Sequence, residues 1–467
     1  MKPSASSKSK WLAFLALGAF SAGLRLYRLD QSFWYDEIIS TLMFFRAPWL
    51  DLLTRMPLAN HHPLYSLLAK LCLLAGGEKE WVLRLPAFLF GSLTPPVLCR
   101  LGWKQFGPRV GVLAGLFLSV AMWPVWFSQD ARGYSAMILF CLLATDLFLT
   151  LAEQFSRRHA VLYMLAAAAA LYSHLYSGAV IASHLLLGLI VSLRADRRGT
   201  GRRLAALSGG GLVLALLLYA PLLPDFLRFT LEQGRLTTGR EMRLNFVGQM
   251  FLAWAAGESH SGLAAVFLLL AATGLGIAAA RRPWLAAVWV LSLLLGGFTP
   301  LILGLFVFQR FFSYALPLFY LFPALALDYL IERLPGRRKM IGWLAAALVM
   351  LILALGLRNY YRYGKQPLRP AAEWIRQNAP GYPTLAAGLV SEVYGYYDRA
   401  AERLPLGEVL QPAMLRHTAV VVSHRWSLKE SDWKLLQQFC RPPQVFPSAG
   451  PPEYEVRVYL CDAPPSP

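Results

Sequence analysis

The sequence predicts a polytopic α-helical membrane protein that carries a small α/β domain at its C-terminal end. Of its 467 residues, 57% are hydrophobic and only 15% are charged, whereas a soluble globular protein carries roughly 25% charged residues. Apolar runs of about 18 residues or more recur along the chain, and each can cross a bilayer as a helix. The runs are uniformly apolar rather than alternating, which excludes a β-barrel. The composition also excludes a soluble multidomain enzyme and a disordered protein.

The apolar runs give about eleven spanning helices. We place them near residues 11–28, 82–103, 109–127, 133–153, 159–173, 176–194, 203–223, 262–280, 284–303, 311–332 and 340–357. The first run follows a basic N-terminus and no small-residue cleavage site comes after it, so we interpret it as an uncleaved span.

Basic residues between the spans predict the orientation of the chain. The first ten residues hold three Lys, and with these spans every other basic cluster falls on the same side. Those clusters lie at 104–109, 157–159, 194–203, 281–282 and 333–339. The positive-inside rule makes that side cytoplasmic, in a bacterial inner membrane. The net charge of +19 thus reflects topology, and no basic-aromatic motif indicates nucleic-acid binding.

Four segments are then expected on the opposite, extracytoplasmic side. They are a first loop at 29–81, a turn at 128–133, a loop at 225–261 and the tail from residue 359. The first loop contains amphipathic blocks at 33–45 and 64–74, which suit helices lying in the membrane interface. We therefore divide the chain into a transmembrane module, residues 1–358, and an extracytoplasmic α/β domain, residues 359–467.

The tail has the composition of a small folded domain. A short helix is predicted at 367–378 and β-type runs at 384–389, 419–424 and 454–460, separated by Pro and Gly turns. With about 105 residues the tail can bury a modest core. Of the five cysteines, Cys440 and Cys461 fall in this tail and could pair in an oxidising compartment.

Two adjacent carboxylates, Asp36 and Glu37, follow Trp34 and Tyr35 just beyond the first span. Carboxylates near lipid are costly and often functional, and these could act as a general base or as metal ligands. Alternatively, both could simply cap the interfacial helix that follows, because acidic residues suit helix N-termini.

Two histidines, His61 and His62, lie further along the same loop, ahead of Pro63 and Tyr65. Neighbouring imidazoles could bind a metal or contact a phosphate. The alternative is a polar turn before an apolar helix that begins at Pro63.

Further polar residues fall on the same membrane side. Asp130, Arg132 and Tyr134 lie between two spans, where the first two could pair locally or serve as a second acid and an anion clamp. Arg310 enters a span from outside, either to snorkel or to bind a lipid-linked phosphate. His174 lies at the outer junction of two spans, as a buried hydrogen-bonded residue or a ligand. A water-filled cavity at this face would explain why these groups gather on one side.

Taken in order, these motifs resemble those of the GT-C membrane glycosyltransferases. The group that looks most similar is the branch of protein O-mannosyltransferases and aminoarabinose (lipid A) transferases. The resemblance covers residues 11–175 well. Its motifs here are Trp34-Tyr35-Asp36-Glu37, His61-His62-Pro63-Leu64-Tyr65, Arg84-Leu85-Pro86, Phe90-Gly91 and Asp130-Ala131-Arg132-Gly133-Tyr134.

The resemblance implies an inverting transfer of a sugar from a polyprenyl-phosphate donor outside the cytoplasm. Asp36 matches the first-loop acid that would deprotonate the acceptor, with Glu37 as the second half of that motif. His61 matches a position near the donor phosphate, and Tyr65 lines the same loop. The chain departs from the pattern at His62, where relatives usually have Pro, and at Asp130, where some have Glu. Metal use varies in the superfamily, so a divalent ion, held by Asp36 or Asp130, is an open expectation.

Inversion needs one carboxylate near the acceptor hydroxyl and positive charge at the leaving phosphate. His61, Arg132 and Arg310 could supply that charge, and we expect a lipid or glycolipid acceptor rather than a protein. A lipid-linked sugar transporter or flippase is an alternative, although such proteins place ionisable groups near mid-membrane. An O-antigen ligase or polymerase is another.

Overall fold

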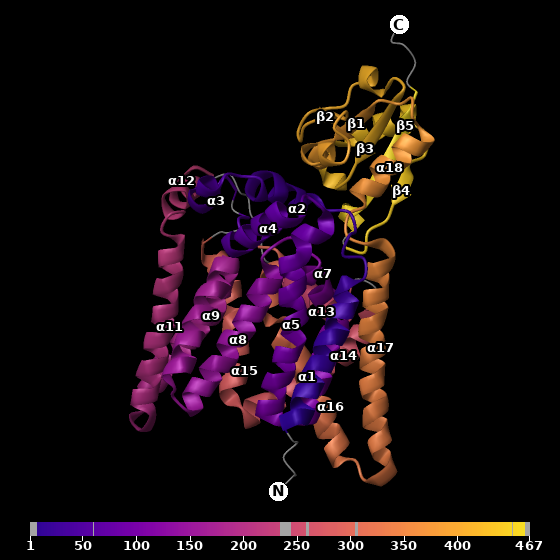
Figure 1. The fold of residues 1–467 in the computed structure, drawn as a ribbon. Helices are drawn as coiled ribbons and strands as arrows, with labels where there is room; N and C mark the ends of the chain where they lie inside the picture. The colour runs from indigo at the N-terminus through magenta and orange to yellow at the C-terminus, as the bar shows by residue number, and fades with distance from the viewer. Residues whose placement is uncertain are drawn as a thin grey trace. The chain divides into compact units, whose positions relative to one another are not determined.

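The computed structural model describes residues 7–58, 60–233, 244–257, 261–303, 307–450 and 452–462 (Figure 1). The chain divides into two compact units. The helical unit comprises Met1–Leu29 and Phe44–Leu357, and the C-terminal unit comprises Asp30–Met43 and Arg358–Pro467. The start of the first loop is therefore part of the C-terminal unit, although it lies more than 300 residues away in sequence.

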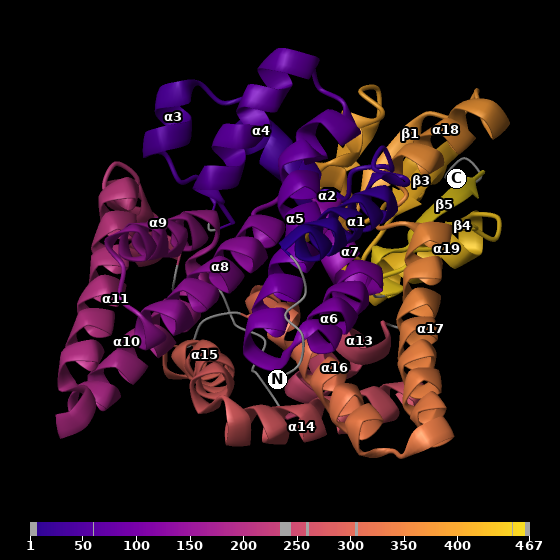
Figure 2. The same cartoon turned by 60° about the horizontal axis from the view of Figure 1, so that its bottom comes forward.

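Long apolar helices make up most of the helical unit and run roughly side by side, as the two views in Figures 1 and 2 show. Pro63, Pro108 and Pro283 begin three of them, because the fixed φ of proline suits the first turn of a helix. The helices are α1 Ser7–Leu26, α3 Trp49–Thr54, α4 Pro63–Gly76, α5 Glu80–Phe106, α6 Pro108–Val120, α7 Met122–Ser128, α8 Tyr134–Glu153, α9 Arg157–Ser173, α10 Gly178–Ser192, α11 Arg198–Tyr219, α12 Leu223–Gln233, α13 Leu244–Ala256, α14 Ser261–Arg281, α15 Pro283–Leu303, α16 Leu316–Arg333 and α17 Lys339–Tyr363.

Every predicted span coincides with a helix of the structure. Among the described residues, seven helices are long and apolar enough to cross a membrane, or eight if the bent pair α6 and α7 is one span. Other helices do not meet this criterion; α9, for example, has only 17 residues. The prediction of a membrane protein built from apolar helices is confirmed, while the count of eleven spans stays a prediction.

A buried arginine of α1 contacts the backbone at the bend of 64° between α6 and α7. A helix that ends inside an apolar layer leaves carbonyl groups that must find other donors. Arg25, which is fully buried, donates to the carbonyl oxygens of Leu118 and Ser119 at 3.4 and 3.2 Å and to Ser128 Oγ at 2.9 Å. One guanidinium thus satisfies the groups exposed by the break, and its fork of donors fixes α1 against α6 and α7.

Two acidic residues within the predicted spans are accounted for by ion pairs. Asp146 lies 2.5 Å from Arg100, and Asp328 lies 2.7 Å from Arg109. Both arginines belong to helix segments at or near the predicted cytoplasmic clusters. These carboxylates are therefore paired for structural reasons, which weakens the transporter alternative.

Among its described residues, the C-terminal unit contains one five-stranded sheet, three α-helices and several short 3₁₀ helices. The strands are β1 Thr384–Ala387, β2 Glu402–Leu404, β3 Thr418–Val422, β4 Gln444–Phe446 and β5 Val456–Cys461. Their order is β2-β1-β3-β5-β4; β2, β1 and β3 are parallel, whereas β5 runs antiparallel to both β3 and β4. The helices are α2 Tyr35–Ser40, α18 Leu368–Asn378 and α19 Glu430–Phe439.

The sequence predicted the three central strands and α18 but missed the edge strands. All residues of β1 and β3 are buried, so each reads as a continuous apolar run. The edge strands β2 and β4 have three residues each and are largely exposed, which leaves no pattern to detect. A disulfide joins Cys440 to Cys461 and ties the end of α19 to β5.

Candidate active site

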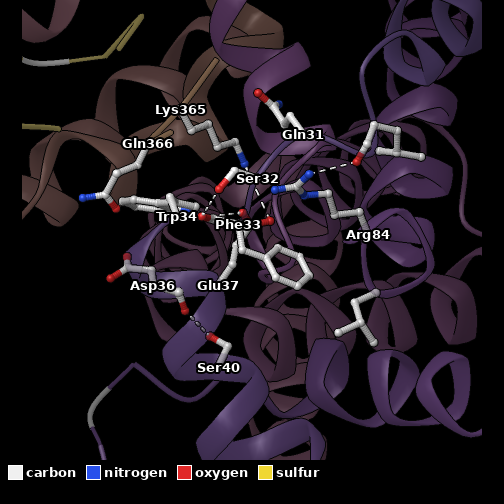
Figure 3. Close-up of polar contacts among 12 residues, drawn as sticks. Gln31, Ser32, Phe33, Trp34, Asp36, Glu37, Ser40, Arg84, Lys365 and Gln366 are labelled. Carbon is white, nitrogen blue, oxygen red and sulfur yellow. Dashed lines mark hydrogen bonds and ion pairs between the residues drawn. The ribbon is translucent and has the colours of Figure 1, made fainter. Parts of the chain in front are cut away.

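Helix α2 holds the acidic motif, and two residues after α17 fix its first turn (Figure 3). Glu37 Oε2 accepts the Trp34 N–H at 3.3 Å, and Gln366 Oε1 accepts the Tyr35 N–H at 2.8 Å. Lys365 Nζ lies 3.8 Å from Glu37 Oε1, and neither side chain is exposed. The donors at the start of α2 are thus satisfied, and the buried carboxylate of Glu37 has a counter-ion.

The two acids of the motif therefore differ in their surroundings. Glu37 caps helix α2, which is the alternative that the sequence analysis gave for both acids. Asp36 is 8% exposed. Its backbone carbonyl accepts a hydrogen bond from the Ser40 hydroxyl at 2.8 Å. We therefore treat Asp36 as the candidate base and Glu37 as the residue that holds the helix.

In the helical unit, five of the predicted residues converge from four elements. We call them the His62 cluster: His62 before α4, Arg132 and Tyr134 at the start of α8, His174 after α9, and Arg310 in the short 3₁₀ helix Gln309–Ala315. The imidazole of His62 lies 4.9 Å from that of His174 and 5.4 Å from the ring of Tyr134, between centroids.

The contacts of His62 define its protonation state. Its Nδ1 lies 3.0 Å from the Ser173 carbonyl oxygen, which can only accept, so Nδ1 carries the proton. Its Nε2 lies 2.9 Å from the Arg132 guanidinium, which can only donate. Burial, together with the charge of Arg132, lowers the pKa of His62 well below its usual range. His62 is thus a neutral residue that orients the Arg132 side chain.

Arg310 joins the cluster through Tyr134. Its Nε donates to the Tyr134 hydroxyl at 3.0 Å, and its guanidinium carbon lies 3.9 Å from the centroid of the Phe308 ring. The guanidinium carbon of Arg132 lies over the Tyr134 ring, 5.6 Å from its centroid. Two guanidinium groups therefore contact one tyrosine, an arrangement suited to an anion with several oxygens.

Gly133 allows the close approach of these elements. A methyl group on its Cα would lie 2.3 Å from the Ser173 carbonyl oxygen and 3.0 Å from His62 Cβ. Gly133→Ala should therefore push His62 off Ser173, lower thermal stability by about 1–3 kcal/mol and reduce activity. Thermal unfolding and sugar transfer measure both effects. Gly199→Ala is the control, because its methyl would meet no described atom within 4 Å; equal behaviour of the two variants would contradict the role of Gly133.

His61 and Tyr65 lie apart from the cluster's contacts. The ring of His61 stacks on Phe44 with centroids 4.3 Å apart, and both its ring nitrogens are buried without a hydrogen-bond partner among the described residues. Burial lowers its pKa to about 4, so the ring is neutral at pH 7. The Tyr65 hydroxyl donates to the Leu83 carbonyl at 2.8 Å and holds α4 against α5.

Asp130 is fully buried in the turn between α7 and α8. Its carbonyl oxygen accepts the Arg132 N–H at 2.6 Å, and the neighbouring Gln129 donates to the carbonyls of Arg25 and Tyr27, both at 2.7 Å. The turn that presents Arg132 is therefore anchored to the end of α1.

Sequence reasoning missed the residues that hold these groups in place. No local motif marks Lys365, Gln366 or Arg25, and their partners are far away in sequence. Arg84 belongs to a motif whose role the sequence does not indicate; its fully buried guanidinium donates to the Leu29 carbonyl at 2.8 Å.

A metal site was an open expectation at Asp36 or Asp130. Across the described ranges, no group of three or more His, Cys, Asp or Glu side chains is arranged to hold a metal ion. A divalent ion therefore stays an open expectation, and we derive no step through one.

Comparison with known proteins shows what this chain is similar to. The model of the family described as dolichyl-phosphate-mannose-protein mannosyltransferase matches residues 60–224, a range that includes the His62 cluster apart from Arg310. ArnT from Cupriavidus metallidurans bound to undecaprenyl phosphate has a similar fold, with a TM-score of 0.59 and 14% identity, over 97% of this chain and 98% of that one. No curated protein sequence matches the chain.

Archaeal oligosaccharyltransferases share the fold as well. An Archaeoglobus fulgidus oligosaccharyltransferase in complex with Zn and sulfate matches with a TM-score of 0.54 and 12% identity, over 96% of this chain and 73% of that one. AglB from the same organism, in complex with an inhibitory peptide and a dolichol-phosphate, matches with a TM-score of 0.53 and 11% identity, over 97% and 74%. The resemblance to GT-C membrane glycosyltransferases is thus confirmed, and with it the prediction that the chain is a glycosyltransferase.

Proposed function

We propose that the protein is an inverting glycosyltransferase that moves a sugar from a polyprenyl-phosphate donor to a lipid or glycolipid acceptor at the extracytoplasmic face of a bacterial inner membrane. The observation that carries this proposal is the His62 cluster, where two guanidinium groups, two imidazoles and a tyrosine converge from four elements. The similar ArnT and AglB structures hold undecaprenyl phosphate and dolichol-phosphate, which are ligands of the chemistry that the cluster suits.

The cluster would bind the phosphate of the donor. Arg132 and Arg310 present planar donor groups that match phosphate oxygens, and His62 keeps Arg132 in place. Because His62 is neutral, it adds no charge and leaves the two arginines to stabilise the phosphate as it leaves. The unpartnered nitrogens of His61 would find acceptors or donors on the same ligand.

Asp36 would act as the general base. As the acceptor oxygen attacks the anomeric carbon, its proton passes to the Asp36 carboxylate, a new glycosidic C–O bond forms, and the bond between the anomeric carbon and the phosphate oxygen breaks. The polyprenyl phosphate leaves with the bonding electron pair, and its added negative charge is met by Arg132 and Arg310. A single displacement of this kind inverts the anomeric configuration.

Washed membranes that contain the protein test the proposal directly. Radiolabelled polyprenyl-phosphate sugars are supplied one at a time, and label is followed into lipid and protein fractions. We expect label to enter a lipid fraction, with inverted configuration at the anomeric carbon. Failure of every donor, with the protein folded, would overturn the transferase proposal in favour of a transporter, and label in a protein fraction would overturn the lipid acceptor.

The disulfide provides a test of orientation. A pair formed by Cys440 and Cys461 is favoured in an oxidising compartment, which supports an extracytoplasmic C-terminal unit. In intact cells, an impermeant maleimide should label these two residues only after reduction. A Cys440→Ser/Cys461→Ser double variant measures the background from other thiols. Labelling that needs disruption of the inner membrane would place the C-terminal unit inside.

A further inference from the structure

Four aromatic rings meet beside the acidic motif within the C-terminal unit. Tyr35 comes from α2, whereas His424, Trp426 and Tyr454 come from the loops that follow β3 and precede β5. The His424 ring lies 6.5 Å from that of Tyr35, 5.9 Å from that of Trp426 and 5.5 Å from that of Tyr454, between centroids. We call these residues the ring cluster.

His424 is held in an unusual backbone conformation. Its φ of 59° and ψ of 83° lie in the left-handed region, which costs free energy for a residue with a side chain and often marks a functional position. Its N–H donates to the Glu453 carbonyl at 2.9 Å, and its Nδ1 lies 3.2 Å from Ser423 Oγ. The surrounding contacts therefore determine where this ring points.

One side chain links the ring cluster to the acidic motif. Gln366 Nε2 donates to Ser423 Oγ at 3.0 Å, while its Oε1 accepts the Tyr35 N–H. The same amide thus fixes both the start of α2 and the serine that contacts His424. A rigid arrangement of rings next to a candidate base is what a substrate-binding subsite requires.

The charges around the ring cluster narrow the class of ligand. The Tyr35 hydroxyl donates to the carboxylate of Glu392, which is exposed, and the negative charge of Asp36 acts on His424. Burial outweighs that charge and lowers the pKa of His424 to about 4, so the imidazole is neutral at pH 7. The two carboxylates can accept hydrogen bonds from hydroxyl or amino groups of a ligand.

Trp426 offers a face for such a ligand. Its side chain is 56% exposed, although it lies against a buried histidine. An aromatic face provides apolar contact area with little loss of side-chain freedom, while hydroxyl or amino donors on the ligand would meet the carboxylates. A sugar ring combines both properties, with an apolar C–H face and a polar edge.

We propose that the ring cluster is an acceptor subsite that binds the sugar headgroup of a glycolipid, with Trp426 and Tyr454 contacting the ring and Glu392 accepting from its hydroxyl or amino groups. The inference rests on the proposed function in assigning this sugar to the acceptor rather than the donor. It makes the acceptor a glycan-bearing lipid, and it assigns the selection of acceptor to the C-terminal unit.

Binding tests the subsite without any requirement for turnover. The full chain in lipid nanodiscs is mixed with a panel of methyl glycosides and methyl aminoglycosides, and saturation-transfer NMR reports contact with each. Glycerol phosphate serves as the anionic probe. We expect signals from the C–H protons of at least one glycoside, reduced about five- to tenfold in Trp426→Ala, as for loss of one aromatic contact. Trp374→Ala is the matched control, since that ring contacts Phe446.

Each result bears on the proposal. Signals that are equal in the wild type and Trp426→Ala, signals from glycerol phosphate alone, or no signal from any glycoside would overturn it. His424→Asn provides a second variant, because Asn tolerates the left-handed region and lacks the ring that contacts Trp426 and Tyr454; it should weaken glycoside binding.

Transfer kinetics separate this inference from the proposed function. Trp426→Ala should raise the KM for the acceptor about tenfold and leave the KM for the polyprenyl-phosphate sugar unchanged. If the wild type binds glycosides through Trp426 but transfers no sugar, the proposed function fails and the subsite remains. If it transfers sugar and Trp426→Ala has an unchanged acceptor KM, the subsite fails and the proposed function remains.

Discussion

Asp36→Asn should lower the rate of sugar transfer by about 10²–10⁴-fold, the range expected when a general base is removed. The amide has nearly the same shape as the carboxylate but cannot take the proton of the acceptor hydroxyl. The hydrogen bond from Ser40 goes to the Asp36 backbone, so the substitution leaves that contact intact. Initial rates with a radiolabelled polyprenyl-phosphate sugar measure the loss, and thermal unfolding checks that the protein is folded.

A matched substitution in the same loop controls for general effects. Asp51 lies in the first turn of α3 and is partly exposed, so Asp51→Asn removes one negative charge without touching α2. We expect its transfer rate to stay close to that of the wild type. Normal turnover by a well-expressed Asp36→Asn protein would sink the assignment of Asp36 as the base.

Arg310→Gln should reduce transfer by about 10²–10³-fold, the loss typical of removing one group that stabilises developing negative charge. The guanidinium donates to Tyr134 and lies over Phe308, and it is only partly buried, so its removal should not unfold the protein. Glutamine keeps a polar side chain but carries no charge for the leaving phosphate. Initial rates and the affinity for polyprenyl phosphate are the two measurements.

Arg333→Gln is the control for this second variant. Arg333 also lies over an aromatic ring, with its guanidinium carbon 4.3 Å from the centroid of Tyr329. It ends α16, whereas Arg310 lies in the 3₁₀ helix that precedes α16. Its substitution should leave transfer and phosphate affinity unchanged. Equal rates for Arg310→Gln and Arg333→Gln would show that Arg310 does not meet the phosphate.

Local patterns determined much of the fold. A helix that crosses a membrane must contain a long apolar run, so the positions of the long apolar helices could be predicted along the chain. The buried strands β1, β3 and β5 were visible for a similar reason. The edge strands β2 and β4 were not, because short exposed strands depend on a neighbour for their hydrogen bonds and carry no pattern of their own.

The convergence of the site could be predicted in part. Topology inferred from Lys and Arg placed Arg132, His174 and Arg310 on one membrane side, and the structure brings all three into the His62 cluster. The inferred topology could not separate His61 from His62. In the structure His61 contacts Phe44, whereas His62 contacts Arg132 and Ser173. Adjacent residues point in different directions, and which one joins a cluster depends on the partners that folding brings near.

The sequence by itself predicted the apolar membrane helices and the resemblance to GT-C membrane glycosyltransferases, because apolar length and ordered polar motifs are local properties of the chain. Only the tertiary structure distinguished the surroundings of the two acids. Glu37 pairs with Lys365 and accepts a hydrogen bond at the first turn of α2, since a buried charge needs a counter-ion. Asp36 lies beside the ring cluster. That outcome depends on Asp30–Met43 and the tail belonging to one unit, a contact between segments over 300 residues apart that no local pattern encodes.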